Sequence, residues 1–113
     1  MHEMTLCQGL VKILEEQAAT HAYSRVKTVW LEIGPLAAVE PEALRFSFDV
    51  AARGTLAENA KLEIITRAAS AWCFSCRETV TISELSAVCP NCGSSQLYPS
   101  GGEEMRIKEL EVD

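Results

Sequence analysis

The sequence contains few of the residues on which most enzymes depend. It has only two histidines, His2 and His21, in 113 residues. Nucleophilic serine or cysteine usually needs a histidine base, and neither histidine lies near the cysteine pairs in the second half of the chain. The sequence also lacks a Gly-rich phosphate loop and an HExxH helix. We therefore predict that the protein is not an enzyme.

Basic clusters and long hydrophobic runs are also missing. The formal net charge is −6, and no stretch is basic enough to follow a phosphate backbone, so nucleic acid is not an expected partner. No segment approaches the roughly 18–20 apolar residues of a membrane span. The first residues lack the basic and apolar regions of a signal peptide. We expect a cytoplasmic protein that does not contact a membrane.

What the sequence does contain is two CxxC pairs. Cys73 and Cys76 form one, Cys89 and Cys92 the other, with twelve residues between them. Four thiolates in this spacing are typical of a closed tetrahedral site that holds Zn²⁺ structurally. Two disulfides, a redox CxxC and a rubredoxin-like iron site are the alternatives. The fifth cysteine, Cys7, lies in an apolar stripe and is predicted to be a small buried hydrophobic residue.

The hydrophobic pattern predicts an α+β fold. Apolar residues recur at helical spacing over 5–21, with Thr5 as N-cap, and again from Glu40 to Ala51. Ile13 belongs to the first apolar stripe, and Phe46 lies in a second stripe of the later helix. Strands are expected at Val26 to Ile33, Lys61 to Arg67 and Met105 to Val112, the last with a β-bulge near Lys108 and Glu109.

The cysteine module falls between the second and third of these strands and has two short β-forming runs of its own, Glu78 to Ile82 and Gln96 to Tyr98. We therefore expect two helices packed on a three-stranded sheet, with a zinc-ribbon-like module inserted between the second and third strands. Residues 1–69 and 100–113 would form the α+β domain, and residues 70–99 the module. A module this small needs the ion in order to fold. Trp30 and Trp72 are expected to pack in the core or at the hinge.

The N-terminus offers a second, different kind of metal site. The α-amine of Met1, the backbone nitrogen of His2 and its imidazole can form fused chelate rings around one ion. Nitrogen donors in a plane suit Ni²⁺ or Cu²⁺. The plainer alternative is a frayed terminus in which His2 has no role.

Several motifs together resemble one known family. The chain is similar to the HypA/HybF nickel metallochaperones of NiFe-hydrogenase maturation, and the similarity extends over essentially its whole length. It rests on Met1-His2-Glu3-Met4-Thr5-Leu6, Ile33-Gly34, Pro41 with Leu44, Phe46 and Phe48, Gly54-Thr55 with Ala60 and Leu62, and the two CxxC pairs.

The resemblance implies two metals with different roles. Ni²⁺ would bind at the N-terminus through His2 and the Met1 amine, with Glu3 as a further candidate ligand. Zn²⁺ would remain structural in the four-cysteine site. Implied partners are a HypB-type GTPase and the hydrogenase large-subunit precursor, with the chain a monomer or a homodimer. The alternative function is a zinc-ribbon adaptor for protein interactions that carries no transferable metal.

Overall fold

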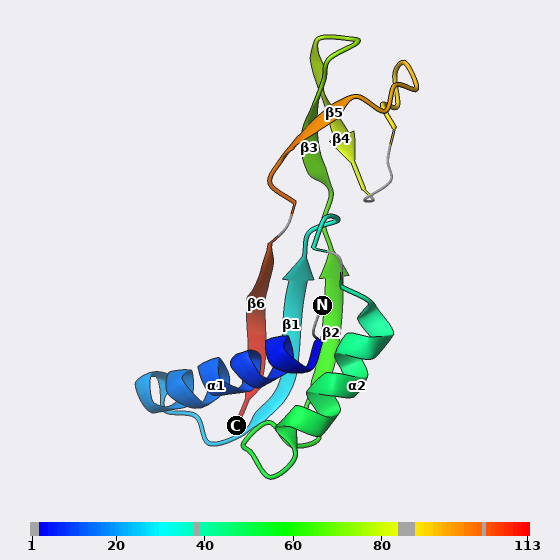
Figure 1. Cartoon of the computed structure of the whole chain (residues 1–113). Coiled ribbons are helices and arrows are strands. Elements are labelled where there is room, and N and C mark those ends of the chain that lie inside the picture. Colours follow the sequence, from blue (N-terminus) through cyan, green and yellow to red (C-terminus); the bar gives the residue numbers. More distant parts are fainter. Residues whose placement is uncertain (1–2, 38, 84–87, 103) are drawn as a thin grey trace. The chain divides into compact units, whose positions relative to one another are not determined.

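The structure is a computed structural model that describes residues 3–37, 39–83, 88–102 and 104–113. Its elements follow the order expected from the sequence, with one additional strand (Figure 1). They are α1 (Glu3–His21), β1 (Val26–Ile33), α2 (Pro41–Ala52), β2 (Lys61–Thr66), β3 (Ala69–Cys73), β4 (Glu78–Ile82), β5 (Leu97–Ser100) and β6 (Met105–Val112).

The strands form two three-stranded sheets. The first has the order β2-β1-β6 and the second the order β4-β3-β5. In the first sheet β1 and β2 point the same way and are joined through α2, whereas β6 runs in the opposite direction (Figure 1). The expected α+β architecture, two helices with a three-stranded sheet and a cysteine module between its second and third strands, is confirmed.

The chain divides into two compact units. The first comprises Met1–Leu31, Val39–Ile64 and Ile107–Asp113, and the second comprises Glu32–Ala38 and Ile65–Arg106. In the first unit α1 packs against α2. Its core consists of fully or nearly fully buried apolar side chains: Cys7, Leu10, Val11, Leu14, Val26, Val29, Leu31, Leu44, Phe48, Ala52, Ala57 and Leu62.

The starts of the two helices differ in how well the sequence predicted them. Helix α2 begins as expected: Pro41 takes the first position, and the Glu40 carboxylate accepts a hydrogen bond from Ala43 N at 2.6 Å. The expectation that Thr5 caps α1 is wrong, because the helix already includes Glu3. Glu3 places an acid in the first turn, where the positive end of the helix dipole favours it.

Two apolar residues expected in the helical stripes are exposed instead. Ile13 is 46% exposed and Phe46 is 68% exposed. The buried face of α1 is confined to Cys7, Leu10, Val11 and Leu14, so Ile13 lies outside it. Phe46 lies about 200° around α2 from Leu44 at 100° per residue, which is opposite the core.

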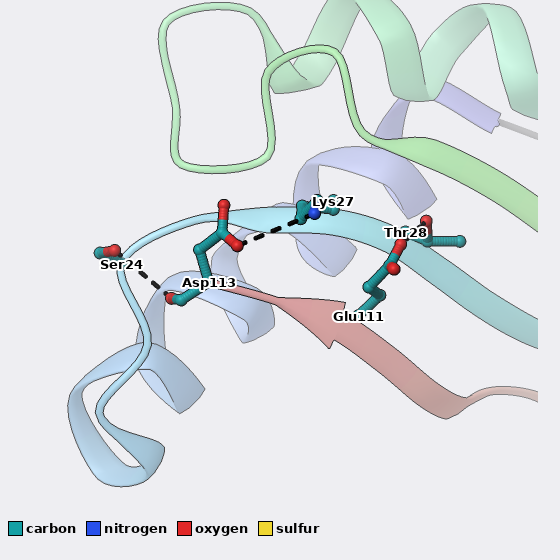
Figure 2. A network of polar contacts seen from close by, with 5 residues as sticks. All are labelled: Ser24, Lys27, Thr28, Glu111 and Asp113. Carbon is teal, nitrogen blue, oxygen red and sulfur yellow. Dashed lines mark hydrogen bonds and ion pairs between the residues drawn. The ribbon is translucent and has the colours of Figure 1, made fainter.

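In the first unit, polar contacts join the end of β6 to the start of β1 (Figure 2). The Thr28 hydroxyl donates to a Glu111 carboxylate oxygen at 2.7 Å, and the Lys27 ammonium lies 3.8 Å from the Asp113 carboxylate. The backbone adds two bonds of 2.9 Å, from Ser24 N to Asp113 O and from Asp113 N to Arg25 O. β6 is therefore held to the central strand by side chains as well as by the sheet.

Within the second unit, Glu32 joins three chain segments that are far apart in sequence. Its carboxylate lies 2.5 Å from Arg67 Nε, just after β2, and 3.6 Å from Arg106 Nε on β6. The Glu32 side chain is only 13% exposed. These residues, with Gly34 and Glu104, line a hollow of about 240 Å³. The charges of its two acids and two arginines balance, and we call this group the Glu32 clamp.

Candidate metal centre

The second unit brings the four cysteines of the CxxC pairs together. Their sulfur atoms all lie within 4.8 Å of one another. Cys73 Sγ lies 3.7 Å from Cys92 Sγ, and Cys76 Sγ lies 3.7 Å from Cys89 Sγ. Sulfur atoms about 2.3 Å from a central ion in a tetrahedron are about 3.8 Å apart. The cluster thus has the dimensions of a tetrathiolate metal site, and it is the only such group among the described residues.

The same distances exclude two disulfides in this arrangement. A disulfide requires sulfur atoms about 2.0 Å apart, and all five cysteines are free thiols. In each of the two 3.7 Å contacts, one sulfur comes from the first CxxC pair and the other from the second. The cluster therefore links the two halves of the module, as a single shared ion requires.

The module holds these cysteines with a small core and two similar turns. Ala71, Val80 and Ile82 pack with Cys73 and Cys89, all nearly fully buried. In the first turn Arg77 N donates to Cys73 O at 2.8 Å, and in the second Gly93 N donates to Cys89 O at the same distance. Arg77 and Gly93 both have positive φ, at 58° and 74°. The residue after each CxxC pair therefore has the same left-handed backbone.

Backbone N–H groups point at the sulfur atoms of both turns. Cys76 N donates to Cys73 Sγ and Asn91 N donates to Cys89 Sγ, each at 3.4 Å. Such donors stabilise a thiolate in a buried place, where its charge would otherwise be costly. The four-sulfur shell can therefore carry the negative charge that a bound cation would offset.

The thiol pKa values agree with a cluster that shares its protons. Although burial opposes ionisation, hydrogen bonds from the backbones of Cys92 and Asn91 lower the pKa of the Cys89 thiol to about 7. Hydrogen bonding to Cys92, together with burial, raises the pKa of Cys76. The lowered pKa favours the thiolate form of Cys89, and an entering divalent cation would displace the remaining protons of the cluster.

The donor set fits a closed structural zinc site. Four thiolates complete a tetrahedron and leave no position for water or a substrate. A bound ion would supply the cross-link that the module's small core lacks.

The N-terminal candidates are placed differently. Met1 and His2 lie outside the described residues. Glu3 is the first residue of α1, partly exposed, and its charge adds to burial in raising the pKa of the Cys7 thiol to about 11. Cys7 is fully buried and its thiol donates to Leu44 O at 3.4 Å, so the predicted core role is confirmed.

Sequence reasoning missed three features of the second unit. Trp72 was expected to pack in the core or at the hinge, but it is 40% exposed on β3. The strand itself was not predicted, because Ala69, Ser70 and Ala71 have low strand propensity. The Glu32 clamp joins residues up to 74 positions apart, and no local pattern could have found it.

The fold and site define an α+β protein with a four-cysteine metal module. Over residues 1–112 the chain matches the HypA family, described as "Hydrogenase/urease nickel incorporation, metallochaperone, hypA". The hydrogenase maturation factors HypA of Azotobacter chroococcum and Acidithiobacillus ferrooxidans are 54% and 55% identical to it, each over the full length of both chains. The chain belongs to the HypA family.

Solved structures show the same fold. The solution structure of the Ni metallochaperone HypA from Helicobacter pylori superposes with a TM-score of 0.70 at 25% identity, covering 99% of this chain and 97% of that one. A second HypA solution structure gives a TM-score of 0.68. Among the described residues, no helix combines the length and apolarity that crossing a bilayer requires.

Proposed function

We propose that this protein is a nickel metallochaperone that binds Ni²⁺ at its N-terminus and delivers it during maturation of NiFe-hydrogenase, and in some settings of other nickel enzymes. The observation that carries the proposal is membership of a nickel-incorporation family over residues 1–112, together with a histidine at position 2. It acts in the cytoplasm and is not an enzyme. Its partners are a HypB-type GTPase and the hydrogenase large-subunit precursor.

The start of α1 supports an ion bound through backbone nitrogen. The first N–H groups of a helix have no intrahelical acceptor, so Glu3 N can exchange its proton for a metal without the loss of a helix hydrogen bond. The Met1 amine, the backbone nitrogen of His2 and the His2 imidazole are the other nitrogen donors in this proposal. Glu3 adds a carboxylate beside them as a ligand or as an orienting group.

The same position supports release. The positive end of the α1 dipole disfavours a cation at this site, and Glu3 offsets part of that repulsion. A site with few side-chain donors at the start of a chain is open to ligand exchange with a partner. Few side-chain donors therefore favour release as well as loading.

The four-cysteine site has a different task in this proposal. Zn²⁺ bound by Cys73, Cys76, Cys89 and Cys92 folds the module over residues 70–99 and stays there, while nickel belongs to the α+β domain of residues 1–69 and 100–113. The tetrahedral sulfur spacing supports the assignment. Zinc supplies a cross-link, and no step of nickel transfer passes through it.

Nickel titration of untagged protein tests the N-terminal site. His2→Ala and a version with one residue added before Met1 are each expected to weaken Ni²⁺ binding by more than about tenfold, a cost of at least 1.4 kcal/mol. The other histidine provides a matched control: His21, at the exposed end of α1, should tolerate alanine without a change in affinity. Equal affinities in all four proteins would refute the site.

The zinc assignment is tested with a matched pair of cysteine substitutions. Cys89→Ser is expected to lose zinc and to unfold the module, because three thiolates no longer close the tetrahedron. Cys7→Ser changes a buried cysteine of the other unit and should retain one zinc per chain. Elemental analysis measures the zinc content of each variant, and proton NMR shows whether the module is folded. Full zinc content in Cys89→Ser would contradict the four-cysteine site.

A further inference from the structure

One face of the β4-β3-β5 sheet carries no charge. The register places Trp72 opposite Thr79 on β4 and Tyr98 on β5, and Ser70 opposite Thr81 and Ser100. Directly paired residues lie on the same face of a sheet. This face, which we call the Trp72 face, therefore consists of two aromatic and four hydroxyl side chains: Ser70, Trp72, Thr79, Thr81, Tyr98 and Ser100.

All six residues are exposed, whereas the opposite face is the core of the module. Trp72 is 40% and Tyr98 is 67% exposed, while Ala71, Val80 and Ile82 on the other face are buried. Tyr and Trp are enriched at protein interfaces and dominate their binding energy. An uncharged surface on a chain of net charge −6 does not serve solubility.

The two edges of this sheet are not equally protected. Phe74 N donates to Gln96 O, so even-numbered residues of β3 bond toward β5 and odd-numbered ones toward β4. On β5 the outward positions are Leu97, whose N–H already donates to Ser95 O, and Pro99, which has no N–H. Pro is one of the devices that block strand addition at a natural edge.

On the outer edge of β4 the described residues include no such device, and the contact nearby is at the start of the strand, where Asn91 Nδ2 donates to a Glu78 carboxylate oxygen at 3.4 Å. The β4 residues paired with Ala71 and Cys73 bond inward, which leaves the N–H and C=O groups of Thr79 and Thr81 directed outward. Among the described residues no further strand pairs with β4 on that side. Neither position holds the Pro or Lys that usually protects an edge. The open edge and the Trp72 face share Thr79 and Thr81.

We propose that this edge and the Trp72 face dock an extended, uncharged segment of a partner protein, which adds to the sheet as a fourth strand beside β4. The main chain of the segment would pair with Thr79 and Thr81. Its side chains on the same face would pass over these small residues toward the Trp72 ring. Charged side chains are disfavoured there, because they would lose hydration without meeting an opposite charge.

The size of the surface favours a short segment over a second copy of the chain. A standard interface takes about 20–30 residues from each partner, and the Trp72 face has six. Two outward residues on β4 offer four main-chain hydrogen bonds, enough for a segment of about five residues. Strand addition of this kind gains affinity from the backbone and selectivity from alternate side chains.

The test uses zinc-loaded full-length protein without nickel, so its failure would leave the nickel proposal untouched. The probe is the capped peptide Ser-Val-Thr-Leu-Thr-Val-Ser, followed by NMR of the backbone amides. We expect shifts at Thr79, Thr81 and the Trp72 indole. A peptide N-methylated at alternate residues, or one with Lys in place of Thr, should bind at least about tenfold more weakly.

Protein variants distinguish peptide binding at the proposed site from nonspecific binding elsewhere on the protein. Thr81→Lys and Trp72→Thr should each weaken peptide binding by at least about fivefold with zinc retained. Phe46→Ala removes an aromatic residue of α2 that is more exposed than Trp72, and it should have no effect. The proposal fails if the N-methylated peptide binds equally well, if the shifts centre on β5 or α2, or if millimolar peptide causes no shift.

Discussion

The two turns that hold the cysteines permit a paired test with opposite signs. Arg77 and Gly93 occupy equivalent positions, each following a CxxC pair and each with positive φ, but only one is a glycine. An L-residue in this conformation costs roughly 1–2 kcal/mol. Glycine avoids this cost, but it loses about 0.5–1 kcal/mol more conformational entropy on folding than another residue does, which reduces its net benefit.

The magnitude follows from the space around Gly93. A Cβ at this position would meet nothing within 4 Å, so Gly93→Ala carries the backbone cost alone and no steric clash. The net loss is about 1 kcal/mol, and Arg77→Gly should gain roughly the same amount. On the proposal that the module folds with bound zinc, the difference should appear in zinc affinity, as changes of about fivefold in opposite directions.

Competition with a chromophoric zinc chelator measures both affinities. Gly9→Ala is the control, because Gly9 lies within α1, its added Cβ would also meet nothing within 4 Å, and it belongs to the other unit. That substitution should leave zinc affinity unchanged. The reasoning is refuted if Arg77→Gly weakens zinc binding, or if Gly93→Ala and Gly9→Ala behave alike.

Two further substitutions test other parts of the chain. Gly34→Ala would place a Cβ against the Gly102 carbonyl and disrupt the 2.7 Å bond from Leu36 N to Gly102 O. The expected cost is about 2 kcal/mol, measured as roughly 30-fold faster amide exchange at Leu36, and unchanged exchange would contradict it. Tyr23 donates to Leu14 O at 2.6 Å, and burial raises its pKa. Its stabilisation is therefore complete below about pH 10 and lost as the pH rises through the folded-state pKa. Tyr23→Phe should lower stability by about 1 kcal/mol at neutral pH and remove this alkaline loss. Tyr98→Phe, at an exposed position, should do neither.

Local sequence patterns predicted much of the fold. β1 and β4 have the expected bounds because β-branched residues alternate between clear turn signals. The four-cysteine cluster was predictable because CxxC spacing is a local constraint on two turns. The family resemblance was carried by short motifs along the whole chain and is confirmed.

What escaped prediction depends on contacts between distant segments. Periodicity alone could not show that Ile13 and Phe46 lie outside the buried faces, since the width of such a face depends on what packs against it. β3 forms from weak strand residues because it pairs with β4 and β5 on both sides. The pairing of Glu32 with Arg67 and Arg106 likewise depends on the completed sheet.

The position of β6 in the sheet has a consequence for folding. β6 pairs with the central strand β1, yet the whole cysteine module lies between Thr66 at the end of β2 and Met105 at the start of β6. The sheet can be completed only by closing that long loop, and closing a loop costs entropy that grows with its length, by about 0.6 kcal/mol per doubling. An ion held by Cys73, Cys76, Cys89 and Cys92 shortens the effective loop before β6 arrives. A metal bound there would lower the entropic cost of completing a sheet that contributes no ligand to it.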